Sequence, residues 1–514
     1  MFRFFTLLVS LLCLCAPDLN AQKHGFRGVW VATVANIDFP SRPGLDTTAF
    51  REEWLSMLAL YRSVGLNAVF VQVRPAGDAF YRSRIAPWSQ FLSGTQGQAL
   101  APGFDPLPFM IETAHANQLE FHAWLNPYRA AMDSTGQGLD EKHPYRQHPD
   151  WFVNYGGKKY FDPGIPAVRN YIAEVVLELV TDYQVDGIHF DDYFYPYPVA
   201  GEEFPDKDSF ERYGFGYSSK ADWRRDNTDR MIRQVAQIIK RVDAGVKFGV
   251  SPFGVWRNIS LDPVNGSATR AGVNTYDDLF ADVRGWLEKG WIDYVVPQLY
   301  WHMGFPAADY DTLVDWWEKN TFQRQLYIGM AAYKVGNHPE KAWGDPEEIP
   351  RQLARNRAGS QVAGEVFFNS SSLRKNPLGL TDSLRRHYAF PALWPPMPYL
   401  GLPLPKPPSL GRPTFRKGIV RIPCKMKYGT DFPPNYLLVY RFADRAPGDV
   451  EDPGNLLMIV PVNGRRKYLI EDPEPVPGDI FTYAATLTNK AYLESPVGRP
   501  RPLRIGKFLL RKTR

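Results

Sequence analysis

Two adjacent aspartates, Asp191 and Asp192, follow a short apolar run at residues 185–190. Two carboxylates at one binding surface can divide the work of acid–base catalysis, because one attacks or activates water while the other donates a proton. A strand that ends in such a pair can deliver both groups to a site. The alternative is that the aspartates only cap the next helix.

Alternation of side chains along this run separates the two aspartates. Ile188 and Phe190 share one face of a strand, whereas His189 and Asp191 share the other. In a parallel barrel the apolar outer face packs on helices, so His189 and Asp191 should point inward at the carboxyl end of the strand, where such enzymes keep their chemistry. Asp192 should then lie on the following loop.

The same alternation places polar or aromatic side chains on the inner faces of other strand candidates, close to their carboxyl ends. One inward polar residue is usually a satisfied core group, but a set that converges predicts a polar pocket. The set comprises Trp30, Gln72, Arg74, His122, Trp124, Asn126, Gln298, Tyr300 and Asn369.

Eight strand candidates occur between residue 26 and about residue 388, each followed by a loop and a stretch with helical spacing of apolar residues. This number predicts an α/β protein with a (β/α)₈ TIM barrel. The candidates are residues 28–32, 68–74, 121–126, 185–191, 247–252, 294–300, 326–331 and 365–369.

The remainder of the chain has a different pattern. Residues 391–413 are rich in proline and predict a stiff linker. Residues 414–514 contain short β-type runs separated by Pro, Gly and Asp, which predict an all-β sandwich of the fibronectin or immunoglobulin type. We therefore expect a barrel domain at residues 22–390, then the linker, then the sandwich.

Residues 1–21 have the features of an export signal: Arg3, an apolar run and Ala21 at the end. The run is too short for an ordinary transmembrane helix. Cys13 and Cys15 each follow leucine rather than the small residue that a lipoprotein signal requires, which disfavours lipid anchoring. We expect a periplasmic or extracellular protein without a membrane span after cleavage.

Composition narrows the function classes. Hydrophobic residues make up 44% of the chain and aromatic residues 14%, so the chain can bury a large core and still offer aromatic surfaces. Only Cys424 would remain after cleavage, which leaves no intrachain disulfide and no cysteine-based metal site. The sequence contains neither a P-loop nor a dinucleotide-binding glycine motif. We expect no cofactor, no bound metal and no nucleic-acid partner.

Charge is unevenly distributed along the chain. Residues 22–405 contain 39 Lys and Arg against 44 Asp and Glu, whereas residues 406–514 contain 20 against 10. A basic C-terminal region suggests an anionic cell-envelope surface as a neighbour. The alternative is a solvated face that only keeps the protein soluble.

From residue 26 to about residue 376 the chain resembles the glycosyl hydrolase-like ten family of exported bacterial proteins. The resemblance implies a (β/α)₈ barrel, often with a C-terminal fibronectin-like module, that acts on glycans; in some members the substrate is thought to be peptidoglycan strands without peptide stems. It rests on the motifs at residues 27–33, 36–41, 72–81, 124–129, 162–164, 191–192, 251–254 and 297–301.

The chain departs from better-studied glycosidase patterns. Chitinase-like barrels use Asp-Gly-x-Asp-x-Asp-x-Glu, but here His189 replaces the second Asp and Tyr193 replaces the final Glu. Cellulase-type barrels place Glu at the ends of strands four and seven, where this chain has Asp191 and Tyr333. A proton donor must therefore come from another position.

These comparisons lead to a hypothesis for a carboxylate pair. We assign Asp191 the role of nucleophile or base. Asp78 is the first candidate for the acid, because it should lie on the loop above the second strand, and Asp162 and Asp192 are the alternatives.

The motifs also suggest substrate-binding residues, although a structural role is an open alternative for each. Hydrogen bonds to sugar hydroxyls would come from polar side chains, and aromatic rings would stack on sugar rings. The candidates are Trp30, Asn36, Asp38, Arg74, Asn126, Arg129, His189, Gln298, Tyr300, Trp301 and Asn369.

Two rival functions stay open. A metal-assisted deacetylase or amidase could use His122, His189 and Asp191, although the sequence lacks the local pairing of histidines common at such sites. A barrel that binds glycan without turnover would conserve the pocket but generate no new reducing ends.

Overall fold

A computed structural model describes residues 22–429, 432–475 and 479–505. The export signal predicted at residues 1–21 lies outside them. No helix in the described part of the chain is long and apolar enough to cross a membrane.

The centre of the molecule is a closed parallel barrel, as the sequence predicts. Neighbouring strands pair in the order β1, β2, β3, β7, β8 and β9, then β11 and β12, and β12 pairs with β1 to close the ring. The sixth position is split into β9 and β10, because Pro297 cannot donate a ladder hydrogen bond. The strands are β1 (Phe26–Val31), β2 (Ala68–Arg74), β3 (Glu120–Leu125), β7 (Gly187–Phe190), β8 (Lys247–Val250), β9 (Tyr294–Val295), β10 (Gln298–Leu299), β11 (Gln325–Met330) and β12 (Val362–Phe367).

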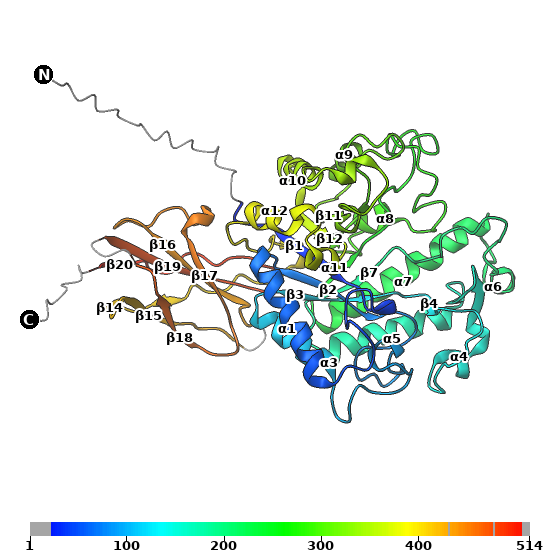
Figure 1. Ribbon diagram of the computed structural model, residues 1–514, viewed down its shortest axis with the longest axis horizontal. Helices are drawn as coiled ribbons and strands as arrows, with labels where there is room; N and C mark the ends of the chain where they lie inside the picture. Colours follow the sequence, from blue (N-terminus) through cyan, green and yellow to red (C-terminus); the bar gives the residue numbers. More distant parts are fainter. Residues whose placement is uncertain (1–21, 430–431, 476–478, 506–514) are drawn as a thin grey trace, which may run out of the picture.

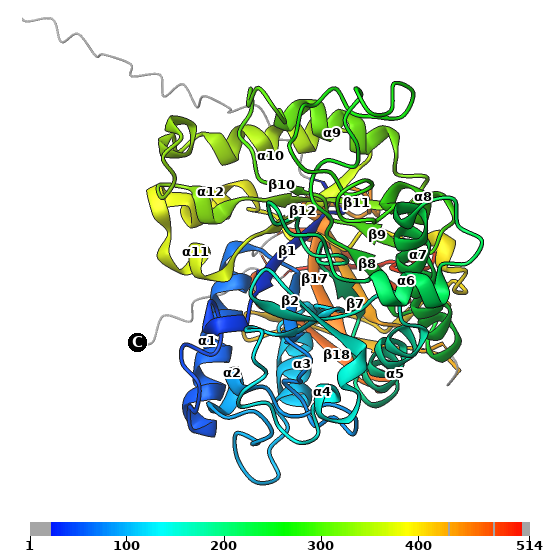
Figure 2. The same ribbon diagram turned by 90° about the vertical axis from the view of Figure 1, so that its right-hand side faces the viewer.

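Helices surround the barrel (Figure 2). Their apolar faces and the outward side chains of the strands form one continuous buried cluster. The helices that cover the strands are α1 (Thr47–Val64), α3 (Pro106–Ala116), α5 (Pro166–Asp182), α7 (Lys220–Val242), α8 (Val283–Glu288), α9 (Tyr310–Lys319), α10 (Glu348–Ala358) and α12 (Leu380–His387). Short elements in the loops are α2 (Gln90–Ser93), α4 (Pro144–Gln147), α6 (Lys207–Tyr213), α11 (Ser370–Lys375), β4 (Arg129–Ala131), β5 (Phe152–Tyr155) and β6 (Lys158–Phe161).

Helix α1 illustrates how the local sequence sets these elements. The Asp46 carboxylate accepts hydrogen bonds from the backbone N–H groups of Thr48 and Ala49, which caps the first turn. Gly65 ends the helix at φ = 86°, a left-handed conformation that glycine adopts without steric cost. Between these ends, Trp54 and Tyr61 are fully buried against the barrel.

Two antiparallel sheets form the C-terminal part, in agreement with the predicted all-β sandwich (Figure 1). Their inner faces enclose a separate apolar cluster. The fibronectin or immunoglobulin type and the domain limits at residues 390 and 414 stay predictions. One sheet contains β13 (Ser409–Leu410), β14 (Thr414–Arg416), β15 (Ile419–Lys425) and β18 (Lys467–Asp472); the other contains β16 (Tyr436–Phe442), β17 (Leu456–Pro461), β19 (Ile480–Thr488) and β20 (Arg501–Arg504).

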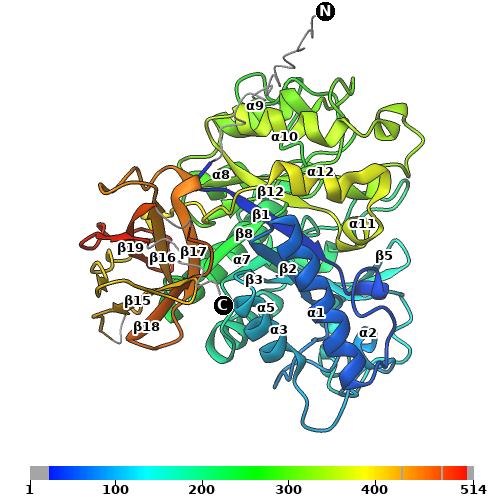
Figure 3. The ribbon, with the colours of Figure 1, turned by 60° about the vertical axis from the view of Figure 1, so that its left-hand side comes forward.

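Strand β16 is buried on both faces. Leu437 and Val439 point into the sandwich, whereas Tyr436, Leu438 and Tyr440 pack in a cluster that also contains barrel residues. This explains the almost continuous apolar run in β16, which a strand with one solvated face would not need. The C-terminal sheets therefore share a core with the barrel, and Figure 3 shows β16 and β17 on the side toward it.

The contacts between the C-terminal region and the barrel lie at the amino-terminal ends of the barrel strands. Lys23, just before β1, forms an ion pair with Glu494 at 2.6 Å, and the Gln118 amide, just before β3, donates to the carbonyl of Ile459 at 2.8 Å. The Tyr399 hydroxyl donates to the carbonyl of Asp293, just before β9, at 2.6 Å. The sandwich thus closes the end of the barrel opposite to the carboxyl ends of its strands.

The first part of the predicted linker, residues 391–413, belongs to this interface. Trp394 is 1% exposed and stacks with the rings of both Tyr436 and Tyr492, at centroid distances of 4.6 and 4.9 Å. Its indole N–H donates to the carbonyl of Asn67 at 2.8 Å. The apolar residues at 390–394 and 397–402 make such packing plausible from the sequence, but they do not identify the partners, which lie far away in the chain.

Replacing Trp394 should measure how much this interface stabilises the fold. We expect Trp394→Ala to lower the free energy of unfolding by about 3–5 kcal/mol, the usual cost of truncating a buried tryptophan. Phe390→Ala, in the same segment but 49% exposed, is the matched control and should change stability by less than about 0.5 kcal/mol. Equal stabilities of the two variants in denaturant titrations would contradict a shared core.

Candidate active site

A pocket of about 380 Å³ opens at the carboxyl ends of the barrel strands. Its walls combine two carboxylates and a few polar groups with many aromatic rings, which is the usual composition of a small-ligand site. The residues that line it are Trp30, Ala32, Val34, Ile37, Gln72, Trp124, Arg129, Asp191, Asp192, Tyr193, Tyr197, Ser251, Gln298, Tyr300, Tyr333 and Phe368.

Asp191 follows β7 and is 3% exposed. Its carboxylate accepts a hydrogen bond from the side-chain amide of Asn126 and one at 3.4 Å from the backbone N–H of Tyr193. Burial, and then the charge of Asp192, raises the pKa of Asp191 to about 7. The group can therefore hold a proton near neutral pH.

Asp192 is the second carboxylate of the pocket and is also buried. Burial raises its pKa, but hydrogen bonds from the side chains of Tyr197 and Gln298 act in the opposite direction. These donors stabilise the ionised form. Two neighbouring carboxylates in one low-dielectric pocket disfavour double ionisation, so the pair tends to share one proton.

Asn126 connects the pair to the polar side of the pocket. Its side-chain oxygen accepts hydrogen bonds from the Gln72 amide at 2.5 Å and from the Arg129 guanidinium at 2.8 Å, while its amide group donates to Asp191. Because both donors fix the oxygen, the amide orientation is set and its N–H must face Asp191. Arg129 is itself held by the carbonyl of Pro75 at 2.8 Å.

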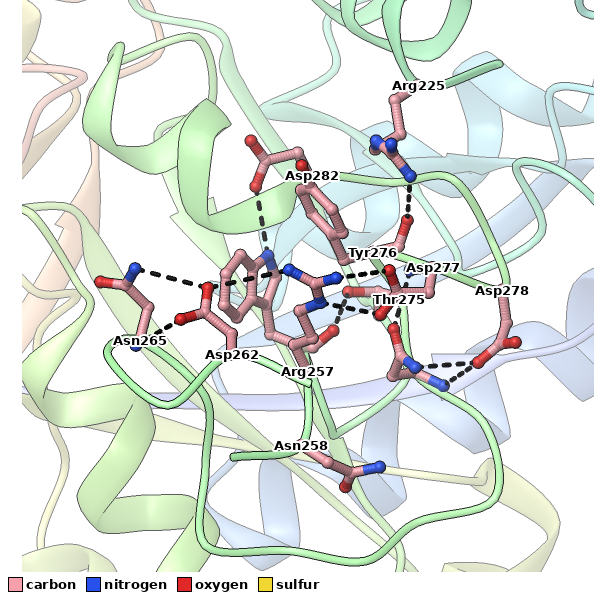
Figure 4. A network of polar contacts seen from close by, with 12 residues as sticks. Arg225, Arg257, Asn258, Asp262, Asn265, Thr275, Tyr276, Asp277, Asp278 and Asp282 are labelled. Atoms are coloured by element: carbon pink, nitrogen blue, oxygen red, sulfur yellow. Dashed lines mark hydrogen bonds and ion pairs between the residues drawn. The ribbon is translucent and has the colours of Figure 1, made fainter. Parts of the chain in front are cut away.

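The loop between β8 and α8 forms part of the rim and is internally braced (Figure 4). Arg257 makes two hydrogen bonds with the Asp277 carboxylate, at 2.8 and 3.0 Å, and Asp262 lies 3.8 Å from the same guanidinium. The Arg225 side chain ties the loop to α7 through the carbonyl of Tyr276 at 3.4 Å. From this loop Ser251 lines the pocket, and its backbone N–H donates to the carbonyl of Phe190 at 2.9 Å.

The structure brings six of the predicted residues to the pocket wall and two directly behind it. Asn126 contacts Asp191, and His189 lies beneath Trp30, whose indole N–H faces its Nε2 at 3.4 Å. The six in the wall are Trp30, Arg129, Asp191, Asp192, Gln298 and Tyr300.

Asp78 and Asp162, two of the predicted acid candidates, do not line the pocket. Asp78 is buried beneath its own loop, where its carboxylate accepts from the backbone N–H of Ala76 at 3.1 Å. Asp162 accepts from the backbone N–H of Gly164 at 2.8 Å, and burial raises its pKa to about 6. Sequence position above a strand did not reveal how the loops fold back. Among the described residues, Asp191 and Asp192 alone supply carboxylates to the wall.

Arg74 points away from the barrel interior, so its predicted inward orientation is wrong. The pairing of β2 with β3 shifts between Gln72 and Arg74, and this irregularity turns the arginine outward. Its guanidinium lies over the rings of Phe161 and Tyr171, 5.9 and 5.4 Å from their centroids. Strict alternation fails wherever a strand contains a bulge.

Four other predicted ligand contacts have structural partners instead. Asn36 donates to the carbonyls of Pro40 and Phe91, and Asp38 accepts from the backbone of Ala32 and Ser371, which joins two loops. Asn369 caps α11 through Ser372, and Trp301 packs edge-on against Phe253. None of the four lines the pocket described above.

Several lining residues were absent from the predicted set. Gln72 was assigned to an inner face but given no role. The sequence gives an indication for three of them. Tyr193 and Tyr197 lie in the aromatic run that follows the two aspartates, and Ser251 is the first residue of the family motif at residues 251–254. Trp124 was expected on an inner face and Tyr333 at the end of the seventh strand, but neither was given a role in binding, and the contribution of Phe368 to the wall was not expected.

No three His, Cys, Asp or Glu side chains within residues 22–429, 432–475 and 479–505 are placed to hold a metal ion. His122, proposed as a ligand in the deacetylase hypothesis, has other partners. Its two nitrogens contact Tyr294 at 2.9 Å and Glu120 at 3.1 Å inside the barrel. That donor set does not converge with Asp191.

The raised pKa of Asp191 predicts a cost to stability at high pH. The folded chain binds a proton at Asp191 up to about pH 7, whereas the unfolded chain releases it near pH 4, so stability falls as pH rises through this window. Asp191→Asn removes this loss. We expect the variant to gain up to about 4 kcal/mol over the wild type between pH 4 and pH 8, by urea unfolding at each pH.

Asp150→Asn, at an exposed position, is the control and should not alter the pH dependence. If the unfolding free energies of wild type and Asp191→Asn change with pH in the same way, Asp191 has an ordinary pKa.

Comparison with known proteins places the chain in a family. The family model described as "Glycosyl hydrolase-like 10" matches residues 25–345. The chain is 48% identical over 419 residues to "Glycosyl hydrolase YngK" of Bacillus subtilis (strain 168), covering 80% of this chain and 82% of that protein. It is 40% identical over 384 residues to "Glycosyl hydrolase DigH" of Escherichia coli (strain K12), covering 70% and 86%.

A solved structure, the PgaB (BpsB) glycoside hydrolase domain from Bordetella bronchiseptica, aligns with a TM-score of 0.46 at 14% identity over 70% of this chain and 98% of that one. The family match covers more than half of the chain and agrees with the barrel and with the carboxylates at the carboxyl ends of its strands. This protein belongs to the glycosyl hydrolase-like 10 family.

Proposed function

We propose that this protein hydrolyses glycosidic bonds with Asp191 and Asp192 as its carboxylate pair. The observation that carries the proposal is the position of two buried, neighbouring carboxylates with raised pKa in an aromatic-lined pocket at the carboxyl end of a barrel. Carboxyl groups that share a proton can supply the acid and the base that glycoside hydrolysis requires.

The surroundings favour a division of roles that differs from the one drawn from sequence. With its pKa near 7, Asp191 can carry the proton and donate it to the leaving oxygen. Asp192 accepts hydrogen bonds from Tyr197 and Gln298, which favour its ionised form, so it would attack the sugar or activate water. We therefore propose Asp191 as the acid and Asp192 as the nucleophile or base.

The pocket wall suits a sugar ring. Trp30, Tyr300 and Phe368 present aromatic rings, and the ring centroids of Tyr300 and Phe368 lie 6.0 Å apart. Aromatic surfaces cover the apolar face of a pyranose, while Gln298 and Arg129 can bind hydroxyl groups. A polysaccharide of the cell wall, such as peptidoglycan strands without peptide stems, is the proposed substrate.

The location proposed for this activity is outside the cytoplasm, on the basis of the features of residues 1–21. The excess of basic residues after residue 405 would favour contact with an anionic envelope surface at low ionic strength. In this proposal the C-terminal sheets serve both as part of the fold and as a basic outer face.

Loss of either carboxylate should remove hydrolysis. We expect Asp191→Asn and Asp192→Asn each to lower turnover of peptide-free peptidoglycan strands by at least about a hundredfold, the usual contribution of a positioned acid or base. New reducing ends are the measurement, and Asp150→Asn is the control. Full binding with no turnover by the wild type would favour the glycan-binding alternative, and activity retained by both variants would refute the proposed pair.

The acidic limb of the pH–activity profile should report Asp192. The Tyr197 hydroxyl lowers the pKa of Asp192 by donating a hydrogen bond, so Tyr197→Phe should raise that pKa and move the limb upward by about one unit. Tyr333→Phe alters another pocket hydroxyl, one that forms no hydrogen bond to either aspartate within the described residues, and should leave the midpoint unchanged. A limb that does not move in Tyr197→Phe would argue against Asp192 as the ionised partner.

A further inference from the structure

A chain of buried polar side chains runs through the barrel from the C-terminal sheets to the floor of the pocket. Tyr492 and Lys247 donate hydrogen bonds to one oxygen of Glu120, and the other oxygen lies 3.1 Å from His122 Nε2. His122 Nδ1 lies 2.9 Å from the Tyr294 hydroxyl, which lies 3.2 Å from His189 Nδ1.

The chain ends at residues of the pocket wall. His189 Nε2 lies 2.9 Å from the Ser251 hydroxyl and 3.4 Å from the indole nitrogen of Trp30. Every member of the chain is at most 2% exposed, from Tyr492 at one end to Ser251 at the other. Bulk solvent therefore does not reach the links between Tyr492 and His189.

Two glycines create the space that the chain occupies. A Cβ atom on Gly187 would lie 2.4 Å from His122 Nδ1, and one on Gly249 would lie 2.2 Å from the Tyr294 ring. Both positions are inward-facing in their strands, where any other residue would displace the side chain of His122 or Tyr294.

The end at Glu120 fixes the direction of the hydrogen bonds. Burial raises the pKa of Glu120, but the charge of Lys247 and the bond to His122 outweigh this effect and hold the pKa below its ordinary value. An ionised carboxylate only accepts, so His122 must carry a proton on Nε2. A neutral His122 then accepts at Nδ1 from the Tyr294 hydroxyl.

The end at the pocket favours the same direction. The indole N–H of Trp30 can only donate, and its contact with His189 Nε2, which is long at 3.4 Å, adds a weak preference for an acceptor at that atom. Burial holds the pKa of His189 far below its ordinary value, which keeps the ring neutral. Its proton therefore lies on Nδ1 and is donated to Tyr294. Donors and acceptors agree at every link.

Tyr492 is delivered to this chain by a specific turn after β19. The Asn489 side-chain oxygen accepts from the backbone N–H groups of Ala491 and Leu493 at 2.9 and 3.0 Å. Tyr492 itself has φ = 57°, a conformation that a bulky residue rarely adopts unless its surroundings impose it. The turn directs the ring into the end of the barrel, over Lys247.

We propose that Glu120, supported by Tyr492 from the C-terminal sheets, positions His189 in the Nδ1–H tautomer and thereby orients Ser251 and Trp30 in the pocket. Ser251 must donate its hydroxyl proton to His189 Nε2, so its oxygen lone pairs are free to accept from a bound hydroxyl group. The C-terminal sheets are then part of the machinery that shapes the site. Only the kinetic consequence of this inference rests on the proposed glycosidase function.

Glu120→Gln should reverse the direction of the hydrogen bonds between residue 120 and His189. Lys247 can only donate, so the new side-chain oxygen will face Lys247 and its NH₂ group will face His122. His122 must then accept at Nε2 and carry its proton on Nδ1. Tyr294 would in turn accept from His122 and donate to His189, which moves the His189 proton to Nε2.

The measurement is the tautomer of His189 by ¹H–¹⁵N NMR of protein labelled in its histidine rings, with the signal assigned through His189→Gln. We expect Nδ1–H in the wild type and Nε2–H in Glu120→Gln. No substrate is needed, so failure of the proposed function cannot be mistaken for failure of this inference. Nδ1–H in folded Glu120→Gln, or a mixture of tautomers in the wild type, would overturn it.

Tyr294→Phe keeps the inference testable if Glu120→Gln does not fold, because it removes only the central hydroxyl. His189 should then lose its single tautomer, since Nδ1–H no longer has an acceptor. An unchanged His189 signal in Tyr294→Phe would equally overturn the proposal.

Tyr492→Phe tests how much the C-terminal sheets contribute to the orientation of His189. It should introduce a detectable fraction of the Nε2–H tautomer and lower kcat/KM by about tenfold, the usual order for loss of an outer hydrogen-bond partner. Tyr436→Phe is the matched control, because Tyr436 also stacks on Trp394 but lies outside the chain of hydrogen bonds. If both variants leave the His189 spectrum unchanged, the C-terminal sheets have no part in orienting the site.

Discussion

The buried ion pair between Glu120 and Lys247 is the constraint on which the arrangement of the two domains depends. Each side chain is 1% exposed, and a charge in such surroundings is costly unless it is paired and hydrogen-bonded. The barrel alone would leave this end open to water. The C-terminal sheets exclude the water, and Tyr492 supplies a further hydrogen bond. The closed end therefore needs residues that lie 372 positions apart in the sequence.

The opposite end of the barrel shows what burial does to carboxylates that have no directly paired cation. Glu120 stays ionised because Lys247 is in contact with it, whereas Asp191 lies beside another aspartate and its pKa rises to about 7. Arg129 offsets part of this effect but is bound to Asn126 and Pro75 rather than to either aspartate. One barrel thus contains a structural carboxylate and a reactive pair, distinguished by their neighbours.

Strand alternation predicted much of the fold and part of the site, because the period of a strand is a local property. It placed His189 and Asp191 inside and Ile188 and Phe190 outside, as observed. It failed at Arg74, where a bulge breaks the period, and it could not place Asp78, whose loop folds back under its own backbone. The partners of Trp394 were also beyond local patterns, since Tyr436, Tyr492 and Asn67 come from distant parts of the chain.

Destabilising features at the pocket are tolerable because the stabilising contacts lie elsewhere. Burial disfavours the ionised forms of Asp191 and Asp192, and Gly187 and Gly249 have no side chain that could add an apolar contact. The helix-covered outer face of the barrel and the shared core with the C-terminal sheets supply large apolar areas that do not touch the carboxylates. A fold whose cohesion lies outside its site can keep reactive groups in unfavourable surroundings, which is the common relation between stability and function in enzymes. In this chain the C-terminal sheets serve both needs, because the surface that stabilises the barrel also carries Tyr492 to the base of the hydrogen-bond chain.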